Sequence, residues 1–61
     1  MNDTLPLAHI WLISRVTRPA DYLGLVNAYT AAGAVACAVS ALQRAGQHFI
    51  ETKDLIADLA E

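Results

Sequence analysis

The chain has 61 residues with four basic and six acidic side chains, and its formal net charge is −2. A chain of this length forms one domain, residues 1–61. It buries only about 60% of the surface that its unfolded form exposes, so it gains from a second subunit. The basic residues form no cluster, which argues against nucleic acid as a partner because phosphates need a basic face.

Cysteine use and the N-terminus bear on where the protein works. The only cysteine, Cys37, has no partner within the chain for a disulfide, and it lies among alanines and valines, where free cysteine behaves as a small hydrophobe. The first residues lack the basic region of a secretory signal peptide. We therefore expect a reduced, cytoplasmic setting.

The first predicted element is a helix over residues 5–17, LPLAHIWLISRVT. Asp3 and Thr4 can serve as N-caps, and Pro6 fits a first helical turn. The helix would be apolar on two sides and would have to be covered on both. The rival interpretation is a strand, since IWLI is rich in β-formers. We favour the helix because no second strand of similar strength is evident, but residues 7–14 stay open between the two.

A long alanine-rich helix is predicted over residues 19–45. Arg18 precedes a proline and is pushed out of the α region, whereas Pro19 suits the first position of a new helix. Gly46 fits the position just beyond the helix end. Such a helix would be about 40 Å long, against roughly 27 Å for a compact globule of this size. It therefore either kinks near Gly33 or is covered by another subunit.

The residue spacing in this helix predicts a helical homodimer. Apolar and small residues follow alternating steps of three and four, as at heptad positions a and d. The same spacing also fits an ordinary buried helix of a three-helix bundle. We favour a seam between two copies, because the flanking helices are too short to cover two apolar rows. The predicted dimer interface consists of Leu25, Ala28, Ala32, Val35, Val39 and Leu42.

A short third helix is predicted over residues 53–61, after a connector that follows Gly46. Thr52 can cap this helix, and Leu55, Ile56 and Leu59 form one apolar stripe. The predicted fold class is therefore all-α, with a first helix, a long central helix and a short C-terminal helix.

No catalytic, metal or cofactor site is predicted, and we expect a protein that is not an enzyme. His9 and His48 could act as ligands or as a base, but no cysteine or histidine lies at the spacing of a metal site. Ser14 and Ser40 lack the glycine elbow of a nucleophile, and no phosphate-binding loop is present.

The predicted function is a small interaction module that binds and modulates a partner protein, in the manner of an adaptor, an antitoxin or a phage inhibitor of host machinery. Aromatic and arginine side chains are enriched at binding hot spots, and the acidic edge of the last helix could meet a basic partner. The predicted partner-binding residues are Trp11, Arg15, Arg18, Lys53, Asp54 and Asp58.

Two alternatives stay open. Residues 22–42 carry no charge and are long enough to span a bilayer, although polar side chains interrupt them. The weaker alternative is a helix–turn–helix DNA-binding regulator formed by residues 40–59. In that arrangement Asp54 and Asp58 would repel phosphates.

Overall fold

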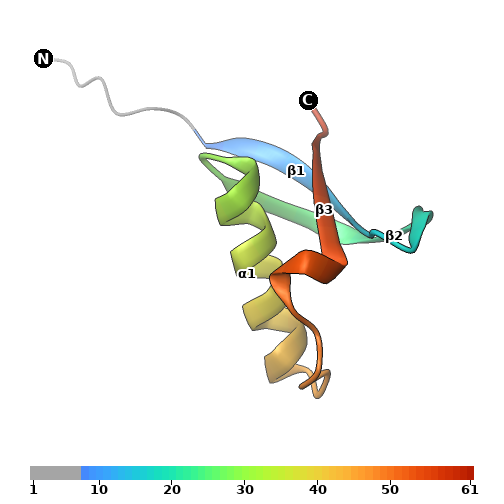
Figure 1. Cartoon of the computed structure of the whole chain (residues 1–61). Helices are drawn as coiled ribbons and strands as arrows, with labels where there is room; N and C mark the ends of the chain where they lie inside the picture. Colours follow the sequence, from blue (N-terminus) through green and yellow to red (C-terminus); the bar gives the residue numbers. More distant parts are fainter. Residues whose placement is uncertain (1–7) are drawn as a thin grey trace, which may run out of the picture.

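Three antiparallel strands and one helix make up residues 8–61, the part of the chain that the computed structural model describes (Figure 1). The strands are β1 (His9–Arg15), β2 (Arg18–Ala28) and β3 (Leu55–Leu59), and their order in the sheet is β2-β1-β3. The helix α1 (Ala31–Arg44) packs against one face of the sheet, and a 3₁₀ turn, η1 (Thr52–Asp54), leads into β3.

The prediction of an all-α protein is wrong, because the fold is mixed α/β and forms no helical bundle within residues 8–61. The first predicted helix is strand β1, the rival interpretation for residues 7–14. Its partners were missed because β2 carries Pro19 and Gly24, which weaken a strand signal in the sequence. The caps predicted at Asp3 and Thr4 lie outside the described residues.

The central helix is half as long as predicted. It begins after Thr30, whose side-chain oxygen accepts the backbone N–H of Gly33 at 3.0 Å and so caps the first turn. The predicted end is confirmed: α1 stops at Arg44, and Gly46 adopts a left-handed φ of 106°. Residues 19–28, the first part of the predicted helix, belong to β2 instead. With α1 reduced to 14 residues, neither a kink nor a second subunit is needed to accommodate it.

The predicted dimer seam is not one helical row. Leu25 and Ala28 lie in β2, whereas Ala32, Val35, Val39 and Leu42 lie in α1. Within α1 the last four differ in environment, since Val39 is buried in the core and Ala32 is exposed. The heptad spacing was counted across the turn between a strand and a helix, so a seam along one continuous helix does not exist.

The third predicted helix is wrong, because residues 55–59 form strand β3, which pairs with β1. Leu55 and Ala57 face the core, whereas Ile56 and Asp58 are exposed. The helix–turn–helix arrangement of residues 40–59 is therefore wrong, since its second helix is a strand. Residues 22–42, the segment considered as a membrane span, are divided between β2, a turn and α1. Within residues 8–61, no helix combines the length and the apolar character that crossing a bilayer requires.

The hydrophobic core lies between α1 and one face of the sheet. The small side chains of Ala34 and Ala38, one helical turn apart, let α1 approach the sheet closely. Burial of a side chain the size of Ile13 stabilises the fold by about 1.5–3 kcal/mol. The buried core residues are Ile13, Ala34, Ala38, Val39, Ile50 and Leu55.

Candidate functional site

The six predicted partner-binding residues do not form one surface. Trp11 and Arg15 lie on the helix-facing side of β1, where both are half-buried. The Trp11 indole N–H donates to the carbonyl oxygen of Ala28 at 2.9 Å, and the Arg15 guanidinium donates to Gln47 Oε1 at 3.3 Å. These two side chains therefore hold parts of this chain together.

Three of the other four residues are also engaged within the chain. Arg18 Nη1 lies 3.4 Å from Asp21 Oδ2. Lys53 Nζ lies 3.6 Å from a carboxylate oxygen of Glu51, whose backbone N–H donates to Asp54 at 2.8 Å. Asp58 differs from them, because it lies on the face of the sheet that α1 leaves uncovered.

That uncovered face, which we call the open face, is defined by the register of the strands. Side chains alternate along a strand, and residues paired across strands point to the same side. Since Ile13 and Leu55 face α1, their neighbours Leu12 and Ile56 face away. The open face consists of Ile10, Leu12, Ser14, Tyr22, Leu25, Asn27, Ile56 and Asp58.

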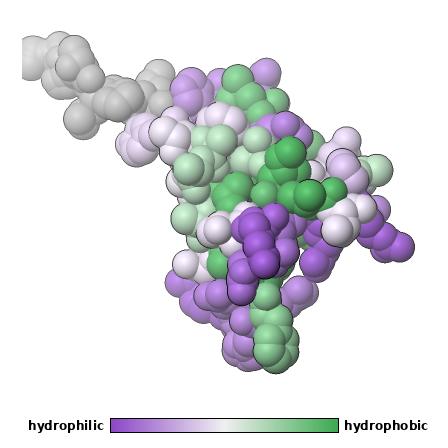
Figure 2. All heavy atoms as spheres, in the orientation of Figure 1, coloured by the Kyte–Doolittle hydropathy of each residue, from purple (hydrophilic) through white to green (hydrophobic). Residues whose placement is uncertain are grey.

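The open face is largely apolar, and its side chains at Ile10, Tyr22, Leu25 and Ile56 are accessible to solvent, whereas Ser14 on the central strand is buried. Tyr22 is 66% exposed, Leu25 62%, and both Ile10 and Ile56 are 42% exposed. Figure 2 shows exposed hydrophobic atoms over the region in which Figure 1 places β3. Single exposed apolar side chains are ordinary, but a contiguous group of them marks interaction sites.

A shallow groove lies between β2 and α1. Its volume is about 190 Å³, and all its lining side chains are apolar, among them Val26, Leu42 and Leu25, the last of which also belongs to the open face. Small-molecule sites usually enclose about 300–1,000 Å³ and contain a few convergent polar groups. This groove is smaller and offers no group for acid–base or nucleophilic chemistry.

A second hollow, of about 270 Å³, lies beside the loop that follows α1. Its lining includes Arg15, Asp54 and the exposed side chains of His48 and Phe49. Arg15 and Asp54 are already bonded to Gln47 and to the backbone of Glu51. The hollow therefore has no pair of acid and base held at hydrogen-bonding distance.

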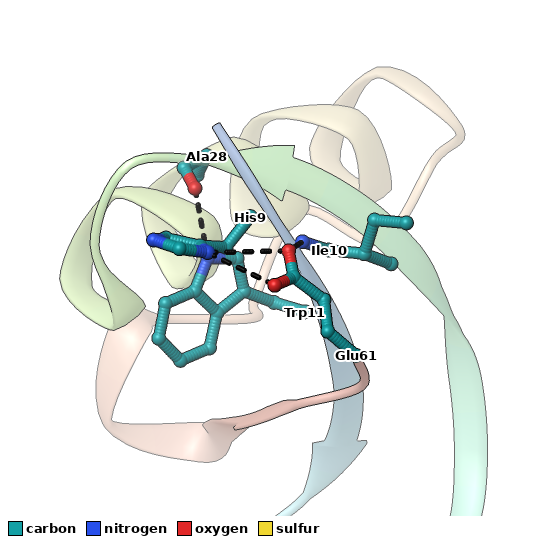
Figure 3. Close-up of polar contacts among 5 residues, drawn as sticks. All are labelled: His9, Ile10, Trp11, Ala28 and Glu61. Atoms are coloured by element: carbon teal, nitrogen blue, oxygen red, sulfur yellow. Dashed lines mark hydrogen bonds and ion pairs between the residues drawn. The ribbon is translucent and has the colours of Figure 1, made fainter. Parts of the chain in front are cut away.

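The beginning of β1 and the residues after β3 are joined by a polar contact that we call the terminal clip (Figure 3). The Glu61 carboxylate lies 3.1 Å from His9 Nδ1 and accepts the backbone N–H of Ile10 at 2.9 Å. The His9 ring meets the Trp11 ring edge to face, with centroids 6.3 Å apart. The hydrogen bond from His9, and then that from the Ile10 backbone, lowers the pKa of Glu61 below its ordinary value.

The clip predicts a pH-dependent contribution to stability. A carboxyl group with a lowered pKa stabilises the fold above its unfolded-state pKa, and this contribution disappears as the pH falls through the folded-state pKa. Glu61→Gln should therefore lower the thermal unfolding midpoint at about pH 7 but have little effect near pH 2. Circular dichroism melts at both values measure this difference. Asp58→Asn, which leaves the clip intact, is the control, and equal losses for Glu61→Gln at both pH values would contradict the assignment.

The described residues offer no obvious metal centre. In residues 8–61, no group of three or more His, Cys, Asp or Glu side chains is placed to hold a metal ion.

Comparison of the chain with protein-family models, curated proteins and solved structures finds no match in any of the three. The candidate site therefore rests on the geometry of the open face alone.

Proposed function

We propose that this chain is a small, non-catalytic interaction module that binds a partner protein and modulates it, and that the open face is its contact surface. The observation that carries the proposal is the group of exposed apolar side chains on this face, led by Tyr22 and Leu25. Antiparallel sheets with one solvated face usually present polar side chains there. An apolar open face gains free energy when a partner covers it, at about 25 cal/mol per Å² of apolar area buried.

Affinity capture from an extract of the source cells tests the proposal. Wild-type protein should retain a specific protein, and Leu25→Asp should lose it, because the substitution places a charge within the apolar contact. Ala36→Asp is the matched control, since Ala36 is exposed on α1 and lies outside the open face. A capture pattern that is the same for all three proteins would contradict the proposal.

The homodimer stays a prediction. The continuous helical seam on which it was based does not exist, so any contact between copies has to use another surface. Light scattering of the wild type and of Leu25→Asp measures self-association and shows whether it depends on the open face.

A further inference from the structure

We propose that the occupant of the open face is an amphipathic helix of the partner protein, with an apolar stripe and a Lys or Arg side chain placed against Asp58. This inference rests on the proposed function and specifies the chemistry of the partner. Two features of the open face support it, its width and its single charged side chain. A third argument is that the free edges of the sheet are poorer docking sites than the face.

The width of the open face suits one helix. Strands lie about 4.8 Å apart, so the outer strands of a three-stranded sheet are roughly 10 Å apart. A helix with its side chains is about 10–12 Å wide. The opposite face of the same sheet is covered in this way by α1, a single helix of 14 residues.

Among residues 8–61, Asp58 is the only charged side chain on the open face. It pairs in register with Leu12, which in turn pairs with Leu25, so an apolar row runs from β2 to the acid. Within residues 8–61, Asp58 takes part in no ion pair and in no side-chain hydrogen bond. Asp58 is exposed on β3, an edge strand, where a charged side chain also discourages pairing with another strand.

An incoming surface therefore has to supply a basic group beside Asp58. Covering the row from Leu25 to Asp58 takes the carboxylate out of water, which is costly unless the charge is paired. A Lys or Arg at the border of an apolar stripe provides that partner and keeps its own aliphatic stem against the apolar row. The same requirement opposes an anionic lipid surface, which would repel the acid.

A second copy of the chain does not meet this requirement. The described residues place no basic side chain on the open face, so stacking two such faces leaves Asp58 against an uncharged residue or against its own counterpart. Arg18, at the hairpin end of β2, is already paired with Asp21. Two copies packed face to face would therefore bury an unpaired carboxylate on each side.

The free edge of β2 is a poorer docking site than the open face. The pairing of β2 with β1 shifts register on both sides of Ser14, and β2 contains Pro19 near its start. Bulges and prolines on an edge strand prevent another strand from adding to it. The other free edge, β3, is five residues long and carries the charged Asp58. Short and charged edges also discourage the addition of a strand, so we place the partner on the face of the sheet.

The probes for the test are two blocked synthetic peptides of about 18 residues, a length at which an isolated helix is partly formed. Both carry a stripe of leucine and alanine. One has a lysine at the border of the stripe, and the other has a glutamate there. Titrations followed by amide chemical shifts should move the signals of Leu12, Leu25 and Ile56, and the lysine peptide should bind about three- to tenfold more tightly.

Substitutions of Asp58 make the test specific. Asp58→Asn should remove the preference for the lysine peptide, and Asp58→Lys should reverse it. Both should fold, since the side chain is exposed and Asp is not favoured in strands. Absence of binding, equal affinities for the two peptides, or shifts confined to the outer side of α1 would each overturn the inference.

The outcome can be separated from that of the proposed function. A native partner that is lost with Leu25→Asp but retained with Asp58→Lys would support the interaction module and refute the basic helix. Self-association of the wild type that Leu25→Asp abolishes would assign the open face to a second copy and refute the inference as well.

Discussion

Ile13→Ala is expected to lower the free energy of unfolding by about 2–5 kcal/mol, whereas Ile10→Ala should lower it by less than about 1 kcal/mol. The two residues are of the same type and lie in the same strand. Ile13 is 1% exposed and belongs to the core, but Ile10 lies on the open face. The difference between the two losses of stability therefore reports only which side of the sheet each isoleucine faces.

Urea denaturation followed by Trp11 fluorescence measures both changes. A chain of 61 residues has roughly 3–9 kcal/mol of stability in total, so Ile13→Ala alone can leave the protein unfolded. Ile13→Val, with an expected loss of about 0.5–1.5 kcal/mol, keeps the experiment quantitative. Similar losses for Ile10→Ala and Ile13→Ala would show that both faces of the sheet are buried, in conflict with the open face.

The same pair of variants separates stability from binding. Ile10→Ala should weaken capture of a partner protein at the open face while leaving the fold intact. Ile13→Val should leave capture unchanged wherever the protein is folded. Truncation of an apolar side chain at an interface commonly matters only at a few positions, so Ile10→Ala is best tested together with Leu25→Asp.

The parts of the fold that follow from local sequence could be predicted. The alanine-rich stretch is helical from Ala31 onward, and its end before Gly46 was recognised from glycine at the position that needs a positive φ. Residues 9–14 were also recognised as apolar on two sides. A central strand such as β1 needs this, because one of its sides packs in the core and the other forms part of the open face. These signals act over a few residues.

The sheet could not be predicted because its pairing is non-local. Strand β3 pairs with β1 across more than half of the chain, and nothing in LIADL alone separates a short strand from a short amphipathic helix. Gly24, which lies within the predicted central helix, pairs with Ile13 beside a bulge. Tertiary pairing therefore overrode local propensity in β2.

The candidate site was predicted only in part. Asp58 was identified as an acid that could meet a basic partner, but as one member of a helix face with Asp54. The structure separates them: Asp54 bonds to the backbone of Glu51, and Asp58 lies on the open face. The apolar residues around Asp58 come from three strands, so they share a face only once the register is known.

The alanines of α1 differ in what they tolerate, and Ala34→Leu is expected to be the most damaging change among them. Ala34 is fully buried in the same core cluster as Ile13, so a larger side chain has to push α1 away from the sheet. Overpacking of this kind costs about 1–3 kcal/mol. Ala36→Leu adds the same atoms at an exposed position of the same helix, where the effect should stay within about 0.5 kcal/mol.

Chemical denaturation of the two leucine variants measures the difference, and helix propensity does not confound it because the substitution is identical. A neutral Ala34→Leu would mean that the space between α1 and the sheet is not fixed by small side chains. A large loss for Ala34→Leu with none for Ala36→Leu would show why alanine occupies this stripe: a close approach of one helix to one face of the sheet demands it. The need for small side chains in α1 then arises within one chain and requires no second helix.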